Sequence, residues 1–309
     1  MKILHLVVGG GKNSWPFVWH SIKLLRINNN YQTYSRSIHN SAILKIFLTL
    51  VYCKLNQIDY IVVHYGGFVS FVFSFFLRKR VIVYYRGTDR NFSLKNRTLR
   101  NYLYKKFDRF TSKNSHAIYT SPSIVHDKFL LKSIILPSPI NIDLLNEFSD
   151  NDIRHLFKED RINIFFYGGN NRVNKGSEVV DILAMEFREL INLIEVPSGM
   201  YSQSEIYNII SKCDLVLHPS LREGSPNVVK EAIYLGVPTL STYVGDIPSY
   251  QSNLSSLVCC NNINEFITAM HKFINNEFLF NFKLDKSYIV KRFGPEKFSS
   301  SFYNFIETL

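Results

Sequence analysis

Short runs of β-branched residues alternate with helical patterns of apolar residues along the first half of the chain. The β-branched runs predict strands, at Ile3–Val8, Tyr60–His64, Val81–Tyr85, Ala117–Thr120 and Ile134–Leu136. The helical patterns fill the intervals, at Ser14–Leu25, Ile43–Leu55, Gly67–Arg78, Leu94–Lys106 and Pro122–Lys132. This alternation is typical of a parallel sheet covered by helices.

The pattern is interrupted between Pro137 and Asp152, a stretch with prolines and no periodic apolar face. A second α/β series follows, with strands at Ile162–Tyr167, Leu215–His218 and Pro238–Ser241 and helices from Ser177 and over Asn227–Leu235. The tail, Gly294–Leu309, has the pattern of an amphipathic helix. We therefore predict an α/β protein with two Rossmann-like domains, at residues 1–150 and 151–293, and a C-terminal helix over 294–309.

Composition supports two folded domains. The chain has 309 residues, of which 46% are hydrophobic and 20% charged, so it can bury a substantial core. Its four cysteines form no C-x-x-C pair and predict neither a zinc site nor a disulfide framework. The most apolar stretch, Phe68–Leu77, is too short to cross a bilayer and favours a buried crossover helix. With no leader-like segment at the N-terminus, we expect a cytoplasmic protein, at most peripheral on the inner face of the cytoplasmic membrane.

The positive charge lies in the first half. The net charge is +11, but residues 1–150 hold 21 Lys and Arg against 7 Asp and Glu, a net of +14. A basic surface attracts acidic lipid, a pyrophosphate-linked acceptor or nucleic acid, although it can also be a solvated surface with no partner. No aromatic and basic recognition motif favours nucleic acid. Membrane contact would use the basic helix that carries Lys95, Arg97, Arg100, Lys105 and Lys106.

The segment from His218 to Pro248 carries the most specific pattern. A strand leads into a loop with Glu223, and a helix follows in whose first turn Pro226 fits because it lacks an N–H. The free amides of Gly224, Ser225, Asn227 and Val228 would form an anion site at the positive helix end. Glu223 before the helix and Glu231 one turn into it can both face sugar hydroxyls. An acidic patch beside an ordinary helix start is the alternative, which the constrained surroundings disfavour.

This segment resembles the E-x7-E element of the family-four retaining glycosyltransferases with the GT-B fold. The resemblance implies two Rossmann-like domains that face each other across a cleft, with the C-terminal helix packing back toward the N-terminal domain. It implies that Glu223 and the amides after it contact the donor sugar, and that Glu231 binds the ribose hydroxyls. Thr242, Gly245 and Asp246 resemble the turn that follows.

A second resemblance lies in Tyr167–Gly176, which contains Gly168 and Gly169. Lys175 and Gly176 match the family's Lys-Gly pair, whereas Asn170 stands at the family's arginine position and Arg172 comes two residues later. We expect Lys175 and Arg172 to stabilise the charge on a departing nucleoside diphosphate. A solvated basic loop is the alternative.

The N-terminal domain is expected to hold the acceptor. Gly9, Gly10 and Gly11 resemble the family's glycine-rich first loop, where backbone can approach phosphate closely. Arg86 stands where many relatives have histidine in His-Gly-x-Asp, and Asp89 completes that motif. Arg86 and Asp89 therefore either contact the acceptor or form a structural turn. The histidines at 64, 116 and 126 are expected to be structural.

The resemblance implies transfer of a sugar, with retained anomeric configuration, from a nucleotide diphosphate donor to a glycan or polyprenyl-diphosphate-linked acceptor. The setting would be bacterial surface polysaccharide (O-antigen or capsule) synthesis. No D-x-D-like metal site is evident, so we expect no cofactor and independence from divalent metal. Two alternatives remain, a catalytically degenerate nucleotide-sugar-binding subunit and a GT-B sugar-nucleotide epimerase.

Overall fold

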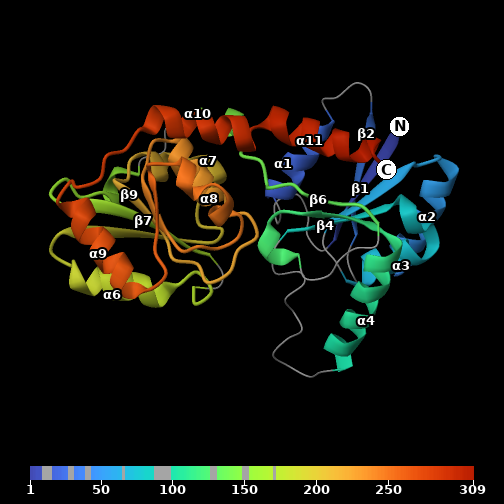
Figure 1. The fold of residues 1–309 in the computed structure, drawn as a ribbon, viewed down its shortest axis with the longest axis horizontal. Helices are drawn as coiled ribbons and strands as arrows, with labels where there is room; N and C mark the ends of the chain where they lie inside the picture. Colours follow the sequence, from blue (N-terminus) through green and yellow to red (C-terminus); the bar gives the residue numbers. More distant parts are fainter. Residues whose placement is uncertain are drawn as a thin grey trace. The chain divides into compact units, whose positions relative to one another are not determined.

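The computed structural model describes residues 1–8, 16–26, 31–38, 43–64, 67–86, 99–125, 131–147, 153–169 and 172–309. The chain forms two compact units. The first contains Met1–Ser138 together with Phe298–Leu309, and the second contains Pro139–Lys297. Each unit is a parallel sheet with helices on both faces (Figure 1).

The sheet of the first unit has six parallel strands in the order β2-β1-β3-β4-β5-β6. They are β1 (Lys2–Val8), β2 (Gln32–Ile38), β3 (Tyr60–His64), β4 (Val81–Tyr85), β5 (His116–Tyr119) and β6 (Ser133–Ile135). Successive side chains of a strand point to opposite faces, so Val63 packs in the cluster under α2 and α3 while Val62 packs in the cluster under α11. Both faces of the sheet are therefore apolar and covered.

The helices of this unit are α1 (Pro16–Leu25), α2 (Ile43–Leu55), α3 (Phe68–Leu77), α4 (Leu99–Asn114) and α11 (Pro295–Glu307). Short 3-10 turns cover Arg78–Arg80 and Pro122–Ile124. The helix α11 buries Phe298, Phe302 and Ile306 against the first sheet, which confirms that the C-terminal helix packs on the N-terminal domain.

The second unit has five parallel strands in the order β11-β10-β9-β7-β8. They are β7 (Ile162–Gly169), β8 (Ile191–Pro197), β9 (Leu215–His218), β10 (Thr239–Ser241) and β11 (Leu257–Cys259). Its helices are α5 (Ile142–Leu145), α6 (Ser177–Glu186), α7 (Gln203–Ser211), α8 (Asn227–Tyr234), α9 (Ile263–Ile274) and α10 (Phe282–Phe293). Residues Arg154–Leu156, Ile247–Ser249 and Gln251–Asn253 form 3-10 turns. The helices α6 and α9 cover one face, and α7 and α8 cover the other (Figure 1).

Several predicted elements differ from the structure. The helix expected over Pro122–Lys132 is wrong within the described residues, because only Pro122–Ile124 forms a 3-10 turn and Val125 is extended. The Ser121 hydroxyl accepts a hydrogen bond from the Ser123 amide, which favours a tight local turn over a helix. The strands β2, β8 and β11 were missed. All three lie at sheet edges, where one exposed side weakens the apolar pattern.

The change from one unit to the other comes earlier in the chain than the sequence pattern indicated. Residues 139–150 were assigned to the first domain, but the second unit begins at Pro139. The Ile140 amide donates to the Phe293 carbonyl at 3.0 Å, and Leu145 is buried in the cluster formed by α8 and α10. The second unit likewise ends at Lys297, because Phe298 is the first residue of α11 in the first unit's core.

The apolar stretch Phe68–Leu77 is the helix α3. It joins two strands that pair in parallel, β3 and β4, and buries Val69 and Phe73. This confirms the crossover-helix interpretation. Within the described ranges, no helix has both the length and the apolar character that crossing a membrane requires.

Candidate donor-binding site

The order of the strands places one particular pair of loops at the crevice of the second sheet. From β7 the chain moves to β8 on one side of it, and then returns to β9 on the other side. At such a reversal the loops after the two central strands separate and leave a crevice at the carboxyl ends. Here the described parts of those loops are residues 172–176, after β7, and residues 219–226, after β9. Both resemblance motifs of the second domain therefore meet at one place.

A glycine brings these two loops into contact. Gly176 has φ +77°, and a Cβ on it would lie 2.0 Å from the Pro219 carbonyl oxygen. The Leu221 amide also donates a hydrogen bond to the Asn174 carbonyl at 2.9 Å. A side chain at position 176 would therefore force the loops apart.

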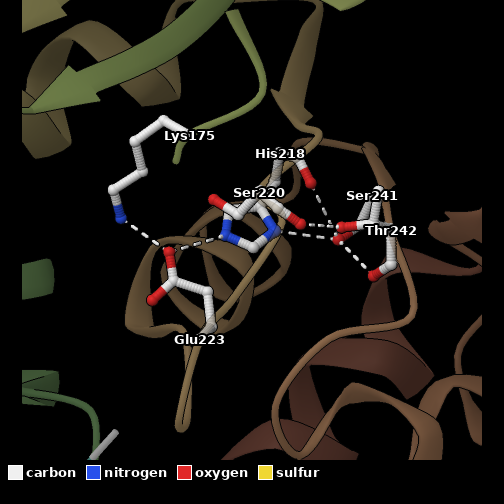
Figure 2. Close-up of polar contacts among 6 residues, drawn as sticks. All are labelled: Lys175, His218, Ser220, Glu223, Ser241 and Thr242. Atoms are coloured by element: carbon white, nitrogen blue, oxygen red, sulfur yellow. Dashed lines mark hydrogen bonds and ion pairs between the residues drawn. The ribbon is translucent and has the colours of Figure 1, made fainter. Parts of the chain in front are cut away.

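The close approach pairs Lys175 with Glu223. The lysine Nζ lies 2.6 Å from Oε1 of Glu223, and Figure 2 shows the two side chains pointing toward each other. Both are only partly accessible, at 27% and 19% exposure. Burial by itself would raise the pKa of the Glu223 carboxyl, but His218 and Lys175 outweigh it and lower the pKa to about 2. Glu223 is thus a carboxylate at neutral pH, suited to accepting hydrogen bonds and unsuited to donating a proton.

Behind Glu223 lies a histidine that the sequence interpretation had not singled out. His218, the last residue of β9, places Nε2 3.7 Å from Oε1 of Glu223 and Nδ1 2.9 Å from the Ser241 hydroxyl at the end of β10 (Figure 2). The Thr242 hydroxyl donates to the Ser220 carbonyl at 2.5 Å and ties the two strand ends together. The sequence did contain an indication of this residue. A polar side chain ends a buried apolar strand, at the edge of the sheet where ligands bind.

The helix α8 begins at Asn227, with Pro226 as its N-cap and no side-chain cap. The amides of its first turn, which include Asn227 and Val228, have no partner inside the helix and give this end a partial positive charge. Gly245 supports the preceding loop, because its φ of +62° lets it approach the Gly224 carbonyl, 2.6 Å from where a Cβ would lie.

Buried polar atoms at this edge have no hydrogen-bond partner among the described residues. They include the Ser220 hydroxyl, Oδ1 of Asn227 and Oδ1 of Asp246. Buried polar groups are usually paired in folded proteins, so such a group needs an explanation. One explanation is a polar ligand that binds at this edge and forms the missing hydrogen bonds.

A buried ion pair, which the sequence interpretation missed, holds the loop after β9 in place. Lys230 of α8 is fully buried, and its Nζ lies 3.1 Å from Oδ2 of Asp246. The Ser225 hydroxyl donates to the same carboxylate oxygen at 2.6 Å and contacts Nζ of Lys230. The pair therefore fixes the position of Ser225, one of the predicted donor-binding residues.

Glu231 lies one turn into α8 and is buried. Its Oε1 accepts a hydrogen bond from the Tyr207 hydroxyl of α7 at 2.7 Å. Burial raises the pKa of this carboxyl to about 7, against the opposing effects of Tyr207 and Lys230. Glu223 and Glu231, which look alike in the motif, therefore have pKa values displaced in opposite directions.

Arg172 has different partners from those of Lys175. Its guanidinium donates to both carboxylate oxygens of Asp181, at 2.9 and 2.6 Å, and to Glu195 at 2.8 and 3.1 Å. The predicted glycines lie beside these groups. A Cβ on Gly168 would lie 2.6 Å from Oε1 of Glu195, and Gly169 has φ +58°. Contact between Arg172 and a diphosphate would require it to exchange these partners.

In the first unit, the predicted residues Gly9, Gly10, Gly11 and Asp89 lie outside the described residues, as does His126. Arg86 follows β4 and is buried, with its guanidinium 4.1 Å from the centre of the Tyr84 ring. Nearby, Nδ1 of His5 lies 3.0 Å from Nε2 of His64. Burial, together with the charge of Arg86, lowers the pKa of His5 to about 3 and also lowers that of His64. These two neutral, buried rings fit a structural role.

The comparisons with known proteins agree with this organisation. Residues 143–291, nearly the whole second unit, match the family model described as "Glycosyl transferases group 1". No curated protein sequence matches the chain.

Solved structures match the fold of the whole chain at low sequence identity. Anabaena HepE, solved in complex with UDP, has a TM-score of 0.70 and 14% identity, with 100% of each chain covered. Sucrose-phosphate synthase from Thermosynechococcus elongatus has a TM-score of 0.74 and 14% identity, covering 100% of this chain and 99% of the other. WaaG, a glycosyltransferase involved in lipopolysaccharide biosynthesis, has a TM-score of 0.57 and 14% identity, covering 97% and 95%. The chain thus has the two-domain fold of the GT-B glycosyltransferases, and its second domain carries the match to the group 1 glycosyltransferase family.

Proposed function

We propose that this protein is a retaining glycosyltransferase that uses a nucleotide diphosphate sugar. The observation that carries the proposal is the meeting of Lys175, Glu223 and the N-terminus of α8 at the crevice of the second sheet. A cation and free helix amides suit a diphosphate, and an adjacent carboxylate suits sugar hydroxyls. The family match over residues 143–291 and the UDP bound to HepE support a nucleotide donor.

In the proposed reaction the bond between the anomeric carbon and the β-phosphate oxygen breaks, and its electron pair leaves with the nucleoside diphosphate. The acceptor hydroxyl oxygen bonds to the same face of that carbon, and its proton passes to the departing phosphate. Lys175 and the α8 amides stabilise the charge that grows on the diphosphate. Glu223 and Glu231 orient the hydroxyls of the donor sugar and of the ribose. Arg172, in the same loop as Lys175, also stabilises the charge on the diphosphate.

The acceptor is proposed to be a glycan or a polyprenyl-diphosphate-linked glycan, as in bacterial surface polysaccharide synthesis. The positive charge of the first unit and the fold shared with WaaG support this assignment. We place the reaction in the cytoplasm, at the inner face of the membrane, where nucleotide sugars and a lipid-linked acceptor meet. The reaction is proposed to need no cofactor and no divalent metal, so chelation with EDTA should leave the rate unchanged.

A thermal-shift screen against UDP-, GDP-, ADP- and TDP-sugars tests donor binding. The matching donor should raise the unfolding temperature of the wild type and not of Glu231→Ala. Product analysis with that donor then tests the reaction, and a retained anomeric configuration is expected. Stabilisation by no nucleotide sugar, with no loss of function in Glu231→Ala, would overturn the proposal. Donor binding without transfer would instead favour a degenerate subunit, and conversion of the donor sugar itself an epimerase.

A further inference from the structure

The helix α2 is apolar on two opposite sides. One side, with Ile46 and Cys53, is buried against the first sheet. The other side consists of Leu44, Phe47, Leu48, Val51 and Leu55, which are 39 to 77% exposed. At 100° per residue these five positions form one continuous stripe along the helix, here called the α2 face. A helix on the surface of a domain normally places polar residues on its outer side, so this face requires a partner.

The charged residues of α2 itself are both positive. Lys45 and Lys54 lie on the two flanks of the α2 face and are exposed, and the helix contains no acidic residue. On the same side of the sheet, α3 exposes Phe75 and Phe76 just before three exposed basic residues, Arg78, Lys79 and Arg80. The helices α2 and α3 both lead into parallel strands, so their C-terminal ends lie at the same edge of the sheet. Apolar and basic side chains thus share one surface.

The charge of the whole unit distinguishes between two possible occupants. Over residues 1–138 and 298–309 the unit holds 21 Lys and Arg against 5 Asp and Glu, a net of +16. A second copy docked through the α2 face would bring two such units together against their mutual repulsion. An anionic bilayer offers the opposite charge for the lysines and an apolar interior for the stripe.

We propose that the α2 face inserts shallowly into the headgroup region of an anionic membrane, with Lys45 and Lys54 contacting lipid phosphates. This differs from the sequence-based expectation, which assigned membrane contact to a basic helix whose residues Arg100, Lys105 and Lys106 lie in α4. The inference extends the proposed lipid-linked acceptor, because it would hold the first domain at the surface that presents such an acceptor. Vesicle binding can nevertheless be measured without any nucleotide sugar, so it is tested independently of donor binding.

The test is flotation of the full chain with vesicles of phosphatidylcholine, with and without about one-third phosphatidylglycerol. The wild type should bind the anionic vesicles, and binding should weaken as salt is added. The double variant Phe47→Gln/Leu48→Gln should lose about tenfold or more in partitioning, because two apolar contacts are removed. Lys45→Gln/Lys54→Gln should bind the anionic vesicles more weakly and lose most of the preference for them.

A matched control is Leu279→Gln/Leu284→Gln, which changes two leucines of the second unit that are 93% and 65% exposed. It should bind vesicles as the wild type does. Circular dichroism and thermal unfolding establish that each variant is folded. No binding of the wild type to anionic vesicles, or equal binding by Phe47→Gln/Leu48→Gln, would overturn the proposal. A dimer that the same variant dissociates, with no vesicle binding, would assign the face to a second copy. Thermal shifts with nucleotide sugars should be the same in these variants as in the wild type. That result would show that the substitutions leave donor binding unaffected.

Discussion

Nζ of Lys230 and Oδ2 of Asp246 lie 3.1 Å apart, and both side chains are almost completely removed from solvent. Burial lowers the pKa of Lys230, and the charge of Asp246 opposes that effect. The pair holds the Ser225 hydroxyl, so it connects the interior of the second domain with the loop after β9. A buried pair of this kind is costly to break because the remaining charge loses its partner.

Replacing Lys230 with methionine should therefore lower the free energy of unfolding by about 3–5 kcal/mol, as measured by urea denaturation. The double variant Lys230→Met/Asp246→Leu should recover part of this loss, because no unpaired charge remains. Both variants should bind the nucleotide sugar more weakly, since Ser225 loses its anchor. A single variant as stable as the wild type would contradict the structural role of the pair.

Replacing Lys175 with methionine should lower kcat by about 100- to 1000-fold, because the growing charge on the diphosphate loses its nearest cation. Steady-state kinetics with the donor found in the thermal-shift screen would measure the effect. Arg172→Met should cost less, since that guanidinium is held by Asp181 and Glu195. Arg188, exposed and paired with Glu189, offers a matched control, and Arg188→Met should leave kcat unchanged. Equal losses in all three variants would argue against a specific role for Lys175.

Glu231 should make folding stability depend on pH. Its folded-state pKa of about 7 lies above the ordinary value of 4.5, so the native state retains a proton that the unfolded state has released. The resulting stabilisation is complete below pH 4.5 and is lost as the pH rises to about 7. The variant Glu231→Gln has no such proton to lose. The stability of the wild type relative to this variant should therefore fall across that range.

Urea denaturation of both proteins at a series of pH values measures this difference. Glu189→Gln, at an exposed carboxyl, serves as the control and should show no comparable trend. A difference between wild type and Glu231→Gln that stays constant from pH 4.5 to 7 would mean that the carboxyl is not protonated in the native state.

Substitutions at two glycines with similar positive φ distinguish the effect of the loop contact from the effect of backbone strain. Gly176 has φ +77° and lies against the Pro219 carbonyl, whereas Gly199 has φ +81° and open space within 4 Å of where a Cβ would lie. Gly199→Ala should cost about 1–2 kcal/mol, from the left-handed conformation alone. Gly176→Ala should cost more and should also weaken donor binding, because it separates Lys175 from Glu223. Equal effects on donor affinity, measured by titration, would contradict the role of the loop contact.

The sequence by itself determined the fold class and the position of the E-x7-E segment. Long apolar strands and the E-x7-E segment depend on local pattern and spacing, so β3, β4, β9 and the start of α8 were predicted directly. The edge strands β2, β8 and β11 and the 3-10 turn at Pro122 were not, because exposed or short elements carry little periodic pattern.

Only the tertiary structure decided how the site residues are paired. Lys175 and Glu223 are 48 residues apart, and their contact depends on the strand order and on the close approach at Gly176. The opposite pKa displacements of Glu223 and Glu231 follow from burial and neighbours that no spacing reveals. The sequence predicted α2 as a helix but not which of its two apolar sides would remain exposed, because that depends on the one surface that the sheet can cover.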